Sequence, residues 1–243
     1  MSATPAKKLT EIPHRERLIA ALDVPSADEA RALVQRLGES VSFYKIGLEL
    51  FLASGFSLVD WLRERGKRVF VDLKFYDVPE TVARAVRQLR GRGITFATVH
   101  GNEAIMRAAA DHKGDIGILA VTVLTSLDRS DLADLGFACD VESLVLARAR
   151  RAVACGCDGV IASGWEARRL RAELGCGFFV VTPGIRPAVT GDDQKRVATP
   201  SQAFADGADY IVVGRPIRDA ADPRQAAEAI QAEVASHFLR TAA

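Results

Sequence analysis

Eight short apolar runs divide the chain, and stretches with helical periodicity separate them. The runs span residues 18–23, 43–47, 69–74, 96–100, 117–122, 159–162, 178–182 and 210–214. Near-continuous apolar runs of this length are typical of parallel strands that are buried on both faces. The helical stretches between and after them span residues 26–37, 49–65, 79–90, 102–112, 141–155, 165–174, 200–206 and 223–238. Eight such alternations predict an α/β fold built as a single closed (β/α)8 TIM barrel.

Local signals support two of the predicted helix starts. Ser26 suits an N-cap, with the carboxylates of Asp28 and Glu29 in the positive first turn. Pro79 suits the first position of the helix over residues 79–90. An open doubly wound sheet is the alternative architecture, but the first turn between strand and helix lacks the G-x-G-x-x-G pattern.

The domain organisation follows from the unbroken alternation. A chain of 243 residues has room for two small domains, but no linker interrupts the pattern, so we predict one catalytic barrel over residues 15–243. Residues 1–14 are predicted to form a flexible tail, because residues 2–10 are mostly polar or small and lack the apolar run of a signal peptide. No run of about 18 apolar residues occurs, so we expect no segment that crosses a membrane.

Composition argues against several classes of partner. The net charge of +1 offers no overall field for nucleic acid or for an anionic membrane surface. The four cysteines are scattered without C-x-x-C spacing, and the four histidines are equally dispersed, so we predict no metal site. This cysteine usage favours reduced, mostly buried thiols in a cytoplasmic protein.

Charged and polar residues gather where the predicted strands end. Asp23 ends the first run, Lys45 lies in the second, Asp72 and Lys74 close the third, and His100 ends the fourth. Alternation along the third strand places Asp72 and Lys74 on one face, about 7 Å apart along the chain. Such charges are expensive to desolvate unless they neutralise one another or a ligand. Barrel active sites lie at this end, so we favour a catalytic mouth over a solvated strand end or structural ion pairs. His100 suits either a structural role or a substrate contact.

The loops after the seventh and eighth runs suit an anion. Barrels often bind phosphate with these two loops and the N-terminus of a short helix. Gly214 lets the backbone approach an anion closely, and Arg215 offers a planar fork of donors. Arg186 and Gln194, in the long loop after the seventh run, can close over the same anion. The alternative is a glycine–arginine turn with a solvated side chain.

Segments along most of the chain resemble the orotidine 5′-phosphate decarboxylase family of bacterial type, in the family's order. They are ALD ending at Asp23, YKIG around Lys45, DLKFYDVPET from Asp72 to Thr81, TVHG around His100, VLTS ending at Ser126, TPGIRP around Arg186, the pair Asp193–Gln194, and VGRPI around Arg215. One departure is visible, because Val189 stands where bacterial members usually carry glycine, and the loop is about one residue shorter. Both differences lie in the loop that is expected to bind the phosphate.

The resemblance implies decarboxylation of orotidine 5′-phosphate to uridine 5′-phosphate, the last step of pyrimidine nucleotide synthesis, without a cofactor or a metal. Loss of CO2 from C6 leaves an electron pair in the ring plane, which the π system cannot delocalise, so preorganised charge must stabilise it. Lys74 would stabilise this carbanion and deliver the proton. Asp72 would hold Lys74, Lys45 would balance Asp72 and reach the ribose, and Asp23 would accept a ribose hydroxyl.

The resemblance also implies a homodimer with shared sites. Asp77 and Thr81 would reach into the neighbouring subunit's site, where Asp77 joins the catalytic charges and both residues bind substrate. Thr125, with Ser126 beside it, would read the pyrimidine.

Two other functions stay open on the sequence. A sister enzyme on the same barrel would use a bound magnesium ion for decarboxylation or aldol chemistry of a keto-sugar phosphate, with the shared aspartates as ligands. The loop with Arg186 and Gln194, and the pair Thr125–Ser126, argue against it. A catalytically dead barrel that only binds nucleotides is the third possibility, although such a module gains nothing from so costly a charge cluster.

Overall fold

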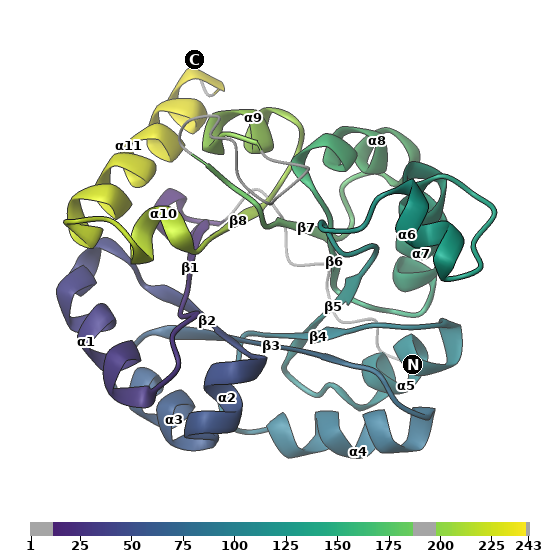
Figure 1. The fold of residues 1–243 in the computed structure, drawn as a ribbon, viewed down its shortest axis with the longest axis horizontal. Helices are drawn as coiled ribbons and strands as arrows, with labels where there is room; N and C mark the ends of the chain where they lie inside the picture. Colours follow the sequence, from purple (N-terminus) through teal and green to yellow (C-terminus); the bar gives the residue numbers. More distant parts are fainter. Residues whose placement is uncertain (1–11, 187–197, 242–243) are drawn as a thin grey trace.

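Eight parallel strands close into a barrel in chain order, and helices surround it (Figure 1). The computed structural model describes residues 12–186 and 198–241. The strands are β1 (Leu18–Ala21), β2 (Phe43–Gly47), β3 (Arg68–Phe75), β4 (Phe96–Val99), β5 (Gly117–Val121), β6 (Gly159–Ile161), β7 (Phe179–Thr182) and β8 (Tyr210–Val213). β1 pairs with β8 as well as with β2, so the sheet has no free edge. The predicted TIM barrel is confirmed.

The helices form the outer ring and match most of the predicted stretches. They are α1 (Ala27–Leu37), α2 (Leu48–Ser54), α3 (Phe56–Glu64), α4 (Pro79–Leu89), α5 (Glu103–His112), α6 (Arg129–Asp134), α7 (Val141–Ala154), α8 (Gly164–Leu174), α9 (Pro200–Ala205), α10 (Arg215–Arg218) and α11 (Pro223–Thr241). Ser26 is the N-cap of α1 as predicted, because its hydroxyl accepts the backbone N–H of Glu29 at 3.2 Å.

The single helix predicted over residues 49–65 is wrong. The structure has two helices, α2 and α3, which meet at Gly55. Gly55 has φ +57°, a left-handed conformation that ends a helix and that glycine adopts without a steric penalty. Apolar residues continue at helical spacing across the break, which is why the sequence pattern did not reveal it.

Aromatic side chains fill the end of the barrel where the strands begin. They are Phe43, Phe70, Phe96, Phe179 and Tyr210, all close to the starts of their strands. Their ring centroids lie 5.4–6.2 Å apart, mostly edge to face. The guanidinium of Arg68 lies 4.3 Å from the ring centroid of Phe43 and pairs with Glu16 at 2.6 Å. This plug leaves the opposite end, where the strands finish, for polar side chains.

Most of the expected tail over residues 1–14 lies outside the described residues; at its end, His14 begins a 3-10 turn and stacks on Phe238. In the described ranges no helix is long and apolar enough to cross a membrane.

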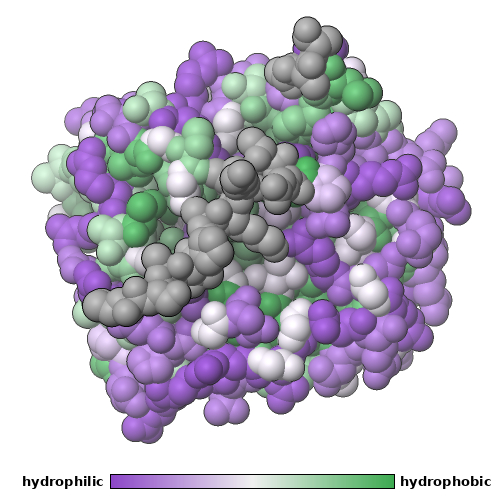
Figure 2. All heavy atoms as spheres, turned by 180° about the vertical axis from the view of Figure 1, so that it is seen from behind, coloured by the Kyte–Doolittle hydropathy of each residue, from purple (hydrophilic) through white to green (hydrophobic). Residues whose placement is uncertain are grey.

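Cys155 and Cys157 are buried, but Cys139 and Cys176 are exposed, so the expectation of mostly buried thiols is wrong for half of them. The face opposite the view of Figure 1 is mainly hydrophilic (Figure 2).

Candidate active site

A pocket of about 240 Å³ opens where β1, β2 and β3 end. Four charged residues predicted from the sequence line it: Asp23, Lys45, Asp72 and Lys74. The remaining lining residues are Leu22, Gly47, Leu48, Glu49 and Leu50. The pocket therefore collects charges from three consecutive strands at the end of the barrel that the aromatic plug leaves open.

These four side chains form a row of alternating charge. Lys45 Nζ donates to Asp23 Oδ1 at 2.9 Å and lies 3.6 Å from Asp72 Oδ2. Lys74 Nζ donates to the other oxygen of Asp72, Oδ1, at 3.0 Å. Each inner charge thus has an opposite charge on both sides, which is the arrangement that offsets the cost of desolvating it.

Burial differs along the row. The inner side chains of Lys45 and Asp72 are 11% and 13% exposed, whereas those of Lys74 and Asp23 at the two ends are 42% and 46% exposed. Burial alone would raise the pKa of Asp72, but the ammonium groups of Lys45 and Lys74 and the hydrogen bonds from Lys74 and Thr98 outweigh it. The pKa of Asp72 is therefore below its ordinary value, and the carboxylate is ionised at neutral pH.

This shift predicts how stability depends on pH. Because the pKa of Asp72 is lower in the folded chain, the unfolded chain takes up the proton first as the pH falls. The stabilisation from its ionised form is complete above about pH 5 and is lost as the pH falls through about 4 and below. We expect the free energy of unfolding of wild type, minus that of Asp72→Asn, to be constant between about pH 7 and 5 and to decrease below that range. Urea titrations at several pH values measure it, and a difference that grows on acidification would contradict the assignment.

The backbone of β3 is irregular at the site. Val71 on β3 pairs with Ala97 on β4, and the next pair is Phe75 with Val99. The segment of β3 between these pairs is longer than that of β4, so the register shifts there. Within the bulge Lys74 has φ +50°, and among the described residues it is the one non-glycine residue with positive φ. For an L-residue this conformation costs on the order of 1–2 kcal/mol. The bulge takes the N–H of Lys74 away from the ladder, and the hydroxyl of Thr98 accepts it at 2.9 Å.

Asp77 and Thr81 are exposed and do not line the pocket. Asp77 lies past the end of β3, where Oδ1 accepts the backbone N–H of Val78 at 2.6 Å. Thr81 lies in the first turn of α4. Within one chain, neither residue joins the row of charges.

The loop after β5 holds Thr125 and Ser126 in a turn, which the backbone hydrogen bond from Leu127 to Leu124 closes at 3.0 Å. Thr125 is half-buried and Ser126 is exposed. Arg148 on α7 donates to the carbonyl of Thr122 at 2.6 Å and so ties the start of this loop to the outer ring.

His100 follows β4 and packs edge to face against Tyr76, with 5.5 Å between ring centroids. Burial, with the positive charges of Arg148 and Lys74, lowers its pKa below the ordinary value. The imidazole is therefore neutral at pH 7, which suits either of its two predicted roles.

One predicted anion-binding residue, Gln194, lies outside the described ranges, as does Val189 in the same loop, because both fall between residues 187 and 197. Arg186 is buried, and its Nη1 donates to the carbonyl of Ile185. Its backbone N–H donates to the carbonyl of Ala198. Gly214 and Arg215 follow β8, and Arg215 begins α10. A Cβ at Gly214 would lie 3.4 Å from Asp23 Oδ2, so the end of β8 adjoins the row of charges.

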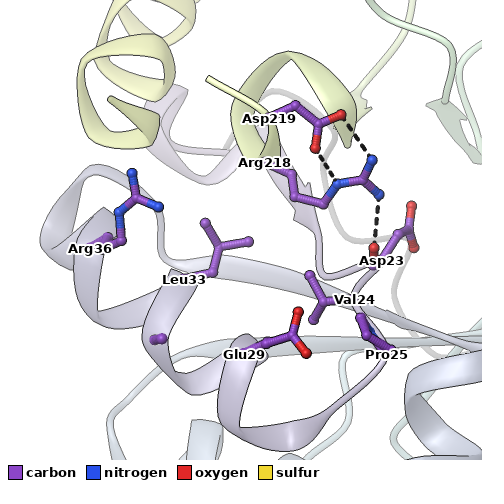
Figure 3. Close-up of a pocket in the computed structure, with 9 residues that line it drawn as sticks. Asp23, Val24, Pro25, Glu29, Leu33, Arg36, Arg218 and Asp219 are labelled. Carbon is purple, nitrogen blue, oxygen red and sulfur yellow. Dashed lines mark hydrogen bonds and ion pairs between the residues drawn. The ribbon is translucent and has the colours of Figure 1, made fainter. Parts of the chain in front are cut away.

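A larger groove of about 450 Å³ lies beside the mouth, between α1 and α10 (Figure 3). Arg218 crosses it, pairing with both oxygens of Asp219 and donating to the backbone carbonyl of Asp23 at 2.8 Å. Arg218 was not predicted as a site residue, and no motif in the sequence signals it. Its contact fixes the backbone that carries Asp23.

Two more residues at the site were missed. A Cβ at Gly47 would lie 3.3 Å from both Asp23 Oδ1 and Lys45 Nζ, so the absence of a side chain there leaves room for this pair. Thr98 donates to Asp72 at 2.9 Å. Alternation from Phe96, which faces the barrel interior, would have indicated an inward hydroxyl at Thr98.

In the part of the chain that the structure describes, no three or more His, Cys, Asp or Glu side chains are grouped to hold a metal ion. The nearest candidates, Asp23 and Asp72, both have ammonium partners.

Comparisons with known proteins agree with one another. The sequence profile of the orotidine 5′-phosphate decarboxylase / HUMPS family matches residues 16–230. An orotidine 5′-phosphate decarboxylase of Methylococcus capsulatus is 64% identical over 230 residues, which cover 93% of this chain and 95% of that protein. One from Rhodopseudomonas palustris is 56% identical over 224 residues, which cover 91% and 95%. The crystal structure of the enzyme from Lactobacillus acidophilus superposes with a TM-score of 0.81 at 36% identity and covers 90% of this chain and 99% of that one.

Proposed function

Because the chain belongs to the orotidine 5′-phosphate decarboxylase / HUMPS family and is a decarboxylase, we propose that its barrel mouth converts orotidine 5′-phosphate to uridine 5′-phosphate and CO2, with Lys74 as proton donor. The observation that carries the proposal is the row of alternating charges, whose neighbours are separated by 2.9–3.6 Å. The reaction belongs to uridine 5′-phosphate synthesis, and we propose that it takes place in the cytoplasm.

The chemistry requires a fixed positive charge beside C6. Departure of CO2 leaves an electron pair in the plane of the pyrimidine, where the ring cannot delocalise it, so stabilisation must come from preorganised groups. A neighbouring ammonium stabilises this charge and then transfers a proton to C6, which yields uridine 5′-phosphate and a neutral amine.

Lys74 suits this role better than Lys45. Lys45 lies between two carboxylates and is 11% exposed, so its charge is already balanced inside the protein. Lys74 has one carboxylate partner and is 42% exposed, so its ammonium can meet a substrate in the pocket. In this proposal Asp72 holds Lys74 in place, and Lys45 and Asp23 bind ribose hydroxyls.

The remaining assignments concern the two ends of the nucleotide. Thr125, with Ser126, is proposed to bind the pyrimidine from the loop after β5. Arg186, Gln194, Gly214 and Arg215 are proposed to bind the phosphate. Remote phosphate contacts contribute to the rate when they strengthen in the transition state, as when a loop closes over the anion.

We further propose a homodimer in which Asp77 and Thr81 complete the partner's site. In one chain, Asp77 lies outside the pocket that holds Lys74. Large apolar side chains are exposed close by, on α2 and before α4: Leu48, Leu52, Tyr76 and Val78, with Leu52 79% exposed. α2 and α4 lie on the same side of the ring of helices (Figure 1). An exposed apolar area beside an incomplete site supports a two-fold interface.

An ultraviolet assay with purified protein and orotidine 5′-phosphate tests the reaction. We expect the orotate absorbance to fall as uridine 5′-phosphate forms, at the same rate with and without a chelator. Absence of turnover on this substrate, together with chelator-sensitive activity on a keto-sugar phosphate, would instead indicate the metal-dependent sister chemistry. Tight binding of uridine 5′-phosphate without any turnover would indicate a binding module.

A further inference from the structure

Thr98 occupies an unusual position in the barrel interior. It lies on β4, is fully buried, and sits between the two residues of β3 that the proposed mechanism uses most. Its Oγ1 accepts the backbone N–H of Lys74 at 2.9 Å and donates to Asp72 Oδ1 at 2.9 Å. A hydroxyl has one proton, so accepting from one group and donating to the other fixes its orientation.

The contact coincides with the irregular stretch of β3. Lys74 adopts its left-handed conformation inside the bulge, where its N–H no longer pairs with a carbonyl of β4. A buried N–H without a partner is costly, and a β4 side chain that replaces the missing carbonyl makes the bulge tolerable. The same oxygen of Asp72 accepts both the Thr98 hydroxyl and the Lys74 ammonium. One side chain therefore contacts the backbone of the lysine and the carboxylate that holds its tip.

We propose that Thr98 is a positioning residue, whose hydroxyl holds the bulged backbone of Lys74 and the carboxylate of Asp72 in one rigid unit. The proposal rests on the function assigned above and deepens it. Thr98 does not touch the substrate in this proposal; it acts by keeping the ammonium of Lys74 at a fixed place. Misplacing a reacting group by about 1 Å is enough to lower a rate by about 10²-fold.

Two pairs of variants isolate the hydroxyl. Wild type and Thr98→Val differ by replacement of the hydroxyl with a methyl group, whereas Thr98→Ser and Thr98→Ala both lack the methyl and differ by the hydroxyl alone. We expect kcat to fall by about 10²-fold in Thr98→Val and in Thr98→Ala, and to stay within about tenfold of wild type in Thr98→Ser. KM and the affinity for uridine 5′-phosphate should change by less than about threefold, because the ribose and phosphate contacts remain.

The pH profile provides a readout that a merely structural role would not move. Asp72 contacts Lys45 on β2, Lys74 on β3 and Thr98 on β4. The other titratable groups nearby are Asp23, which pairs with Lys45, and His100, which follows β4. Removing the Thr98 hydroxyl takes a donor from the ionised carboxylate and raises its pKa. The fall of kcat/KM at low pH, which is the acid limb of the profile, should therefore lie at higher pH in Thr98→Val than in wild type. In Thr98→Ser it should not move.

Thr122→Val is the matched control. Thr122 is a buried threonine that follows the neighbouring strand β5, and its hydroxyl donates to the carbonyl of Ile161 at 2.8 Å. We expect this variant to keep kcat within about tenfold of wild type. If Thr98→Val does not fold, the comparison of Thr98→Ser with Thr98→Ala decides the question.

Three results would overturn the inference: a Thr98→Val protein with kcat within tenfold of wild type, equal losses in the serine and alanine variants, or an acid limb that does not move. Its failure is distinguishable from failure of the proposed function. If wild type decarboxylates orotidine 5′-phosphate and Lys74→Ala does not, while loss of the Thr98 hydroxyl has no effect, only the role of Thr98 is wrong. If wild type is inactive on this substrate, the proposed function itself is wrong.

Discussion

Lys74→Ala is expected to lower the rate of the chemical step by at least about 10⁴-fold, which corresponds to about 5 kcal/mol in the barrier. The alanine removes the charge that stabilises the carbanion and the proton that C6 receives, and each loss is worth about 10²–10⁴-fold. Nucleotide binding should persist, because the proposed ribose and phosphate contacts are made elsewhere. Single-turnover decarboxylation measures the rate, and calorimetry with uridine 5′-phosphate measures binding.

Lys113→Ala is the matched control for this experiment. Lys113 Nζ pairs with Asp158 Oδ2 at 2.7 Å, next to the starts of β5 and β6 at the opposite end of the barrel. The variant loses a lysine–aspartate pair of similar geometry without altering the mouth. It should fold and decarboxylate at nearly the wild-type rate. A Lys74→Ala protein within tenfold of wild type would exclude Lys74 as the proton donor.

The strands were predictable because burial on both faces leaves little choice of side chain. β2 spans the predicted residues, and β1 ends at Ala21 rather than at Asp23. The difference has a physical reason, since Asp23 leaves the sheet to accept a hydrogen bond from Lys45. Helix ends were also close to prediction where a cap or a proline marks them, as at Ser26 and Pro79.

The short helix α6 and the irregular backbone of β3 were not predicted. α6 begins at a capping box formed by Asp128 and Asp131, a signal that is present in the sequence and was overlooked. The bulge at Lys74 has no such signal. Its left-handed φ accompanies a register shift against β4 and a backbone N–H that the Thr98 hydroxyl accepts, whereas a periodic pattern reports burial rather than backbone angles.

The charges at the mouth could be predicted as a group, because the carboxyl ends of all barrel strands meet at one end. Their order could not, since it depends on contacts between strands: Lys45 on β2 lies between the aspartate that follows β1 and the one on β3. The sequence also cannot tell whether Asp77 acts in its own chain or in a partner. That question needs an experiment on two chains.

Mixing Lys74→Ala and Asp77→Ala chains, each nearly inactive alone, is expected to restore about a quarter of wild-type activity. If Asp77 completes the partner's site, a hybrid dimer has one site with both changes and one site with neither. Random exchange of equal amounts makes about half of the dimers hybrid, and each hybrid has one intact site of two. The mixture is assayed for decarboxylation after exchange, with the separate variants measured at the same concentration.

The geometry makes the outcome decisive, because Asp77 is exposed and does not line the pocket that holds Lys74 in its own chain. Two differently tagged variants, purified through both tags, show that hybrids have formed. Lys74→Ala mixed with the double variant Lys74→Ala/Asp77→Ala is the control, since no combination of these chains restores Lys74 and activity should stay absent. If tagged hybrids form and remain inactive, Asp77 acts on the Lys74 of its own chain, and the shared site is wrong even if the protein is a dimer.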